Sequence, residues 1–108
     1  MGTKADVITF VKGMLEVRIF PNRDEMGQDA AKDVSAAIQE LQKTKEEINM
    51  IFAAAPSQSD FMKALIRDKA IQWERVNAFH MDEYIGLEKD ASQGFGNFLK
   101  RHLFDHVP

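Results

Sequence analysis

The expected fold follows from residues 75–87, which read RVNAFHMDEYIGL. Arg75–Phe79 is short and apolar, as a buried strand is, and the acids Asp82 and Glu83 follow it closely. In sheets covered by helices, ligands bind where the strands end, so the polar residues at a strand exit are candidates for chemistry. The stretch therefore predicts a strand that carries Asp82 to the edge of a sheet.

Upstream of this stretch, the sequence predicts further strands that alternate with helices. Residues 15–20 alternate apolar and polar side chains, as a half-buried strand does. Residues 23–42 place apolar side chains three or four apart, which predicts a helix capped by Asn22. Ile48–Ala55 is a continuous apolar run, typical of a strand covered on both faces, and a second helix is expected over 60–68. The residues expected to face inward from the first helix are Met26, Ala30, Val34, Ile38 and Leu41.

The order strand, helix, strand, helix, strand predicts an α/β fold with a Rossmann-like parallel sheet and flanking helices. Residues 1–108 are expected to form a single domain, with 1–14 as an irregular leader and a last helix near 97–104. Within the leader, the apolar residues 7–11 fit either a strand or a helix. Because Pro56–Ser59 and His80–Gly86 both follow strands, we expect them at the same, ligand-binding edge of the sheet.

The composition limits the classes of function. A net charge of −3 over 108 residues provides no positive field to collect nucleic acid or anionic lipid. The absence of cysteine excludes disulfides, thiolate metal sites and a cysteine nucleophile, and it fits a reducing compartment. The apolar runs are too short to span a bilayer, and the first residues lack the order of a signal peptide. We therefore expect a cytoplasmic protein without nucleic-acid or membrane partners.

The turn Ser57-Gln58-Ser59-Asp60 has two interpretations. Free backbone N–H groups and serine hydroxyls at the start of a helix are suited to binding the oxygens of a phosphate. Ser57 and Asp60 also have the spacing of a capping box, which only closes the end of the helix. The residue types alone favour the cap.

The acids Asp82 and Glu83 are neighbours, so in an extended chain their side chains point to opposite faces. One of them can enter a pocket while the other supports the backbone or meets solvent. His80 and Asp82 can share a face, but a metal site lacks a third ligand nearby. By residue type alone, a solvated turn is more common here than a catalytic base.

A family resemblance adds to this interpretation. Residues 79–87 (FHMDEYIGL) and 98–107 (FLKRHLFDHV) resemble the signature of glucosamine-6-phosphate deaminase/isomerases. Residues 52–58 (FAAAPSQ) resemble the phosphate loop of one branch, although that loop is often richer in glycine and threonine. The related 6-phosphogluconolactonases usually have arginine where Tyr84 stands, so Tyr84 favours the deaminase. The resemblance runs from about Leu15 onward, and Met-Asp-Glu-Tyr is its specific part.

The resemblance implies a reaction: conversion of glucosamine 6-phosphate to fructose 6-phosphate and ammonia, a step of amino-sugar catabolism, without a metal or organic cofactor. It implies that Asp82 is the general base that moves a proton between C2 and C1 of the opened sugar. It also implies that Ser57 contacts the phosphate of the substrate. The further candidates for substrate binding are Gln58, Ser59, His80, Glu83 and Tyr84.

Members of that family are much longer, and their second half carries the groups associated with ring opening. The chain is therefore expected to be the N-terminal part of the fold, a truncated form or fragment with little activity alone. Two alternatives stay open: a non-catalytic sugar-phosphate-binding or assembly module, and a paralogous isomerase or lactonase for another sugar phosphate, such as galactosamine 6-phosphate. An unprotected sheet edge also predicts a homo-oligomer.

Overall fold

A computed structural model describes residues 7–108, and these form an α/β fold with two small sheets. The strands are β1 (Ile8–Lys12), β2 (Leu15–Ile19), β3 (Ile48–Phe52) and β4 (Val76–His80). The helices are α1 (Arg23–Gln42), α2 (Ser59–Ile66) and α3 (Phe95–His102). Short 3₁₀ turns lie at Pro56–Gln58, Trp73–Arg75 and Phe104–His106.

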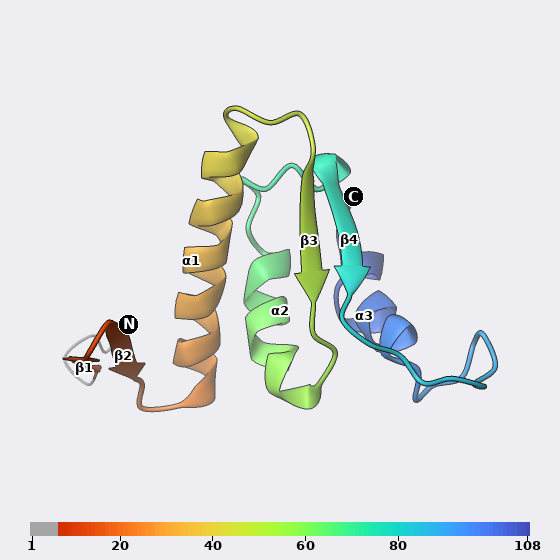
Figure 1. Cartoon of the computed structure of the whole chain (residues 1–108), viewed down its shortest axis with the longest axis horizontal. Coiled ribbons are helices and arrows are strands. Elements are labelled where there is room, and N and C mark those ends of the chain that lie inside the picture. The colour runs from red at the N-terminus through yellow and green to blue at the C-terminus, as the bar shows by residue number, and fades with distance from the viewer. Residues whose placement is uncertain (1–6) are drawn as a thin grey trace.

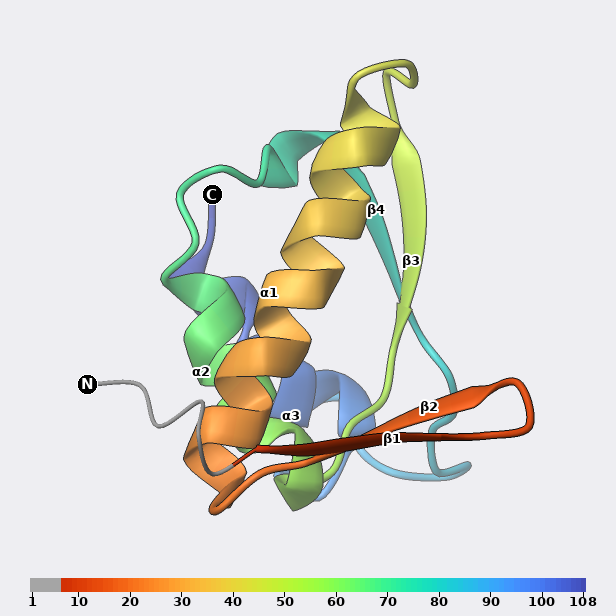
Figure 2. The same cartoon turned by 90° about the vertical axis from the view of Figure 1, so that its left-hand side faces the viewer.

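The centre of the fold is the parallel pair β3–β4, in the register Ile48↔Val76 to Phe52↔His80. The N–H of Met81 donates to the carbonyl of Phe52 at 3.0 Å, which continues the pairing one residue beyond β4. The three helices lie on one side of this pair, and its other side has no helix across it (Figures 1 and 2). The parallel pairing through α2 agrees with the expected Rossmann-like arrangement.

The core lies between the sheet and the helices. Four side chains on α2, on α3 and just after α3 are almost fully buried: Met62, Leu65, Leu99 and Leu103. The rings of Phe52 and Phe104 meet edge to face, with 5.5 Å between their centroids. Trp73 is buried as well. These contacts fix the inner face of β3 against α2 and α3.

Helix α1 begins and ends as predicted, and Asn22 caps it, since its side-chain oxygen accepts the N–H of Glu25 at 2.9 Å. Its inward face differs from the prediction. Met26 and Leu41 are 49% and 45% exposed. The buried residues are Gly27, Ala31, Ser35, Ile38 and Gln42, a line turned by about one residue. The reason is the close approach of α2 near Gly27, where an added Cβ would lie 2.8 Å from Asp60, so the first part of that line consists of the small residues Gly27, Ala31 and Ser35.

The prediction that residues 15–20 join the parallel sheet as a third strand is wrong, because β2 pairs with β1 and not with β3. β1 and β2 form an antiparallel hairpin in the register Ile8↔Ile19 to Lys12↔Leu15. Gly13 lies in its turn with φ +63°, a conformation that glycine adopts without strain. Arg18 holds the hairpin to α1 through Asp29 and Asp33, at 2.6 and 2.5 Å. The expected irregular leader, residues 1–14, thus contains a strand, while residues 1–6 lie outside the described part.

The other boundaries differ by a few residues. β3 ends at Phe52, before the expected Ala55, and β4 begins one residue late because Trp73–Arg75 forms a 3₁₀ turn. Arg75 lies in this turn, and its guanidinium donates to the carbonyl oxygens of Glu46 and Gln42, at 2.7 and 2.8 Å. Among residues 7–108, no helix combines the length and apolar character that a membrane span requires.

Candidate functional site

The candidate site is the carboxyl edge of the β3–β4 pair. Because the two strands are parallel, they end at the same edge, and the segments that follow them begin there (Figure 1). Residues 53–58 continue from β3 into the turn before α2, and residues 81–94 continue from β4 to α3. The two segments singled out in the sequence therefore follow neighbouring strand ends, as predicted.

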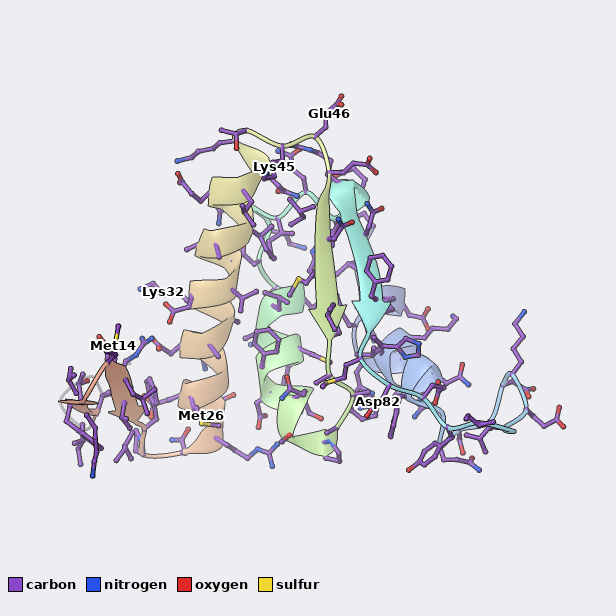
Figure 3. All side chains as sticks on the ribbon, in the orientation of Figure 1. Met14, Met26, Lys32, Lys45, Glu46 and Asp82 are labelled. Atoms are coloured by element: carbon purple, nitrogen blue, oxygen red, sulfur yellow. The ribbon has the colours of Figure 1, made fainter. Side chains whose placement is uncertain are left out.

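Asp82 lies at the end of β4 (Figure 3) and is exposed. Within residues 7–108 its carboxylate has no hydrogen bond or ion pair, so the contact considered with His80 is not formed. An unpaired carboxylate at this position is free to accept a proton from a ligand. The Asp82 carboxylate is exposed to solvent, so only a ligand or another segment that covers this edge of the sheet can desolvate it.

The carboxylate of Glu83 accepts hydrogen bonds from backbone N–H groups of the chain, and its expected contact with substrate stays a prediction. Its Oε1 accepts the N–H groups of Tyr84 and Phe95, at 3.0 and 2.8 Å, and its Oε2 accepts that of Gly96, at 2.9 Å. Phe95 and Gly96 open α3, whose first N–H groups have no partner within the helix. The N–H groups of Gly96 and Phe95, helped by Tyr84 and the nearby His80, hold the pKa of Glu83 below its usual range. Glu83 therefore anchors α3 to the exit of β4.

His80 and Tyr84 belong to the same anchor. A Cβ placed on Gly96 would lie 3.2 Å from Cε1 of His80 and 3.4 Å from Oε2 of Glu83, so glycine leaves room for both side chains. The ring of Tyr84 packs on that of Phe95 with centroids 4.8 Å apart. The structure thus brings His80, Glu83 and Tyr84 together around the start of α3, with Asp82 left free between them.

The turn before α2 does not form the capping box that the sequence allowed. The residue at the cap position, Gln58, makes no side-chain hydrogen bond to α2. The carboxylate of Asp60 pairs with the guanidinium of Arg23, and Arg23 also donates to the carbonyl of Pro56 at 2.9 Å. Within the described residues the Ser57 hydroxyl has no hydrogen-bond partner. The cap interpretation of Ser57 is therefore wrong, and its anion-binding interpretation stays a prediction.

Ser57 and Gln58 line a hollow of about 340 Å³ between α1 and α2, and Arg23 and Asp60 line it too. Asp82 is not among its lining residues, and Ser59 borders another hollow, between α2 and α3. The residues expected to bind phosphate are therefore divided between two surfaces. Arg23 is a candidate that the sequence analysis missed. The sequence marks Arg23 only as the first residue of a helix that follows a strand, and that position does not reveal its contacts with Pro56 and Asp60.

Two parallel strands joined through α2, with helices packed on one face, define the class as a Rossmann-like α/β fold. A solved monomeric glucosamine-6-phosphate deaminase of the NagB superfamily superposes with a TM-score of 0.70 and 21% identity, covering 80% of this chain and 35% of that one. A putative 6-phosphogluconolactonase from Neisseria gonorrhoeae gives a TM-score of 0.68 and 21% identity, covering 79% and 36%. Both structures share the fold with this chain.

The sequence relatives are more specific. The glucosamine-6-phosphate deaminase of Clostridium perfringens strain SM101 is 32% identical over 89 residues, which is 80% of this chain and 35% of the relative. Those of Borreliella burgdorferi strain ZS7 and Pseudoalteromonas translucida are 32% and 28% identical, covering 82% and 86% of this chain and 35% and 34% of theirs. No protein-family model matches. The resemblance to glucosamine-6-phosphate deaminases is thereby confirmed, and the chain spans about a third of the length of these relatives.

Proposed function

We propose that this chain carries the proton-transfer part of a deaminase/isomerase site for an amino-sugar phosphate, with glucosamine 6-phosphate as the first candidate substrate. The observation that carries the proposal is the free Asp82 carboxylate at the strand edge of a chain whose curated relatives are glucosamine-6-phosphate deaminases. Asp82 acts as the base that takes the proton from C2 of the opened sugar and returns it at C1. A general base contributes about 10²–10⁴-fold in rate when it reaches the proton.

The phosphate is assigned to the turn before α2, where Ser57 and the cation Arg23 border one hollow. A helix N-terminus alone contributes about 0.3–1 kcal/mol toward an exposed anion, so binding to this turn is weak without further cations. Arg23 already pairs with Asp60, and a phosphate has to compete for it. Ring opening and protonation of the leaving amine are left to residues beyond the matched third, so this chain alone is expected to have little activity.

Phosphate binding is tested by titrating the ¹⁵N-labelled chain with glucosamine 6-phosphate and with glucosamine. The phosphorylated sugar is expected to shift the amides of residues 57–60 and the free sugar to leave them unchanged. Ser57→Ala should weaken the shifts, while Ser92→Ala, an exposed loop serine, should not. Equal shifts with unphosphorylated glucosamine would show that the phosphate has been placed wrongly.

A non-catalytic sugar-phosphate-binding module is the second candidate, because Asp82 does not line the hollow that holds Ser57 and Gln58. The two candidates separate in a chimera in which this chain replaces the matched third of the Clostridium perfringens relative. A module predicts a chimera that binds glucosamine 6-phosphate without turning it over. The proposed enzyme predicts ammonia release that depends on Asp82. Galactosamine 6-phosphate, assayed alongside, tests the paralogous alternative.

A further inference from the structure

A hollow of about 420 Å³ lies between α2 and α3, on the side of the sheet that carries the helices (Figure 2). Three cations line it: Lys63 on α2, Arg67 directly after α2, and Arg101 on α3. Among the described residues, Asp60 is the only acid in the lining. The hollow therefore carries an excess of positive charge, although the net charge of the whole chain is −3.

In the described part of the chain, none of these three cations has an acidic partner. The side chains of Lys63 and Arg67 make no hydrogen bond or ion pair within residues 7–108. The guanidinium of Arg101 donates to the backbone carbonyl of Ser92, at 3.1 Å. Lys63 and Arg67 are four residues apart, so their like charges are neighbours on the helix surface and repel. An anion bound between them removes this repulsion.

The acids close to the hollow are engaged elsewhere. The carboxylate of Asp60 pairs with the guanidinium of Arg23 on α1. The carboxylate of Asp105 pairs with the ammonium of Lys100, at 2.7 Å. The carboxylate of Asp68 accepts a backbone N–H two residues further on, at 2.8 Å. The positive charge of the hollow is therefore open to an anion from solution.

The helix dipole explains only part of this arrangement. Cations near the carboxyl end of a helix are stabilised by its dipole, and Lys63 and Arg101 lie in the last turns of α2 and α3. The dipole acts on each helix separately. It does not require the two helices to bring their cations to the same hollow.

We propose that this hollow binds a small anion of the phosphate class with at least two negative charges, such as a diphosphate. Guanidinium groups bind phosphate oxygens in pairs, and an ammonium adds further donors. The hydroxyl of Ser59, which also borders the hollow, is another possible donor. The volume lies in the range of small-molecule sites, and the negative net charge of the chain opposes a long polyanion. Ser57 and Asp82 do not line this hollow, so the inference goes beyond the proposed function.

The test is a titration of the ¹⁵N-labelled full chain with inorganic pyrophosphate at constant ionic strength. The reporters are the amides of Arg101, His102 and His106, residues that line this hollow and not the one at Ser57. Pyrophosphate is expected to shift these amides saturably. A parallel titration with glucosamine 6-phosphate distinguishes a phosphorylated sugar from a free diphosphate as the source of the phosphate, through the tighter of the two affinities.

The variants Lys63→Gln and Arg67→Gln remove charge on α2 while the reporters lie on and just after α3. Each is expected to weaken binding about 3- to 10-fold, the loss that corresponds to one exposed charge contact. Lys45→Gln is the matched control, because it removes the same charge from an exposed residue on the turn after α1 (Figure 3). The dispersion of each spectrum reports whether the variant is folded.

Absence of saturable shifts with both ligands would overturn the proposal. An equal loss of affinity in Lys45→Gln would also overturn it, because the attraction would then be a general effect of charge. Loss of the pyrophosphate shifts in Ser57→Ala would place the anion in the other hollow and contradict the proposal as well. Shifts that depend on Lys63 and Arg67, with the amides of residues 57–60 unchanged by glucosamine 6-phosphate, would support this site and count against the proposed function. The two failures are therefore distinguishable.

Discussion

Replacement of Gly27 by alanine tests the packing that positions the phosphate turn. Gly27 lies on α1 where α2 approaches closely, and an added Cβ would stand 2.8 Å from both the carbonyl carbon and Cβ of Asp60. The N of Phe61 would be 2.9 Å away. These are backbone or near-backbone atoms, which cannot rotate aside, so α2 has to move as a unit. The turn that carries Ser57 moves with it.

Two effects of opposite sign set the magnitude. Alanine is favoured over glycine in a helix by about 1 kcal/mol, whereas an extra methyl in a close-packed contact costs about 1–3 kcal/mol. We expect a net decrease of up to about 2 kcal/mol in the free energy of unfolding. The assay is urea denaturation followed by the fluorescence of Trp73, which is buried.

Ala37→Gly is the control for the helix-propensity effect, since Ala37 lies in α1 and is exposed. It should lower the stability by about 1 kcal/mol through helix propensity alone. If Gly27→Ala instead raises the stability by that amount, the close approach of α1 and α2 is incorrect, and with it the position of the turn before α2.

Three further predictions concern the core, the anchor of α3 and the assembly. Leu99→Ala should lower the free energy of unfolding by about 2–5 kcal/mol, because Leu99 is fully buried, and thermal unfolding measures it. The pKa of Glu83 is depressed in the folded state, so its stabilisation is present above the unfolded value of about 4.3 and lost as the pH falls through the folded one. The protection factor of the α3 amides, which is the exchange rate corrected for its intrinsic dependence on pH, should therefore fall in acid. Glu83→Gln should lower the protection factor already at neutral pH and remove that dependence; an unchanged acid response in the variant would exclude Glu83 as its source. The free strand edges predict self-association, which a monodisperse monomer in sedimentation would contradict.

The features that depend on neighbouring residues in the sequence were predicted correctly. Asn22 and the spacing of apolar residues gave the bounds of α1, and the apolar runs located β3 and β4. The pairing of β2 was not predictable in this way, because strand partners are a tertiary choice, and the turn at Gly13 supplied a nearer partner than β3. The buried line of α1 was missed because it depends on how closely α2 approaches, and the sequence of α1 does not show that distance.

Part of the geometry of the candidate site could be predicted from the sequence, while the roles of its residues stay predictions. The two-residue period of a strand suggested that one acid of the Asp82–Glu83 pair would support the backbone, and Glu83 does so. The partners of Glu83, Phe95 and Gly96, are more than ten residues away, so no local pattern could name them. Arg23 was missed for the same reason, since its contacts with Pro56 and Asp60 join segments distant in sequence.

The most direct test of the central claim is the exchange of the C2 proton of glucosamine 6-phosphate with solvent, in the chimera that completes this chain with the Clostridium perfringens sequence. Asp82→Asn keeps the shape of the side chain and removes the base, so exchange should slow by about 10²–10⁴-fold while folding is retained. Glu83→Gln, which changes the anchor of α3, should retain most of the exchange. If the Asp82→Asn chimera exchanges the proton at the parental rate, Asp82 is not the base.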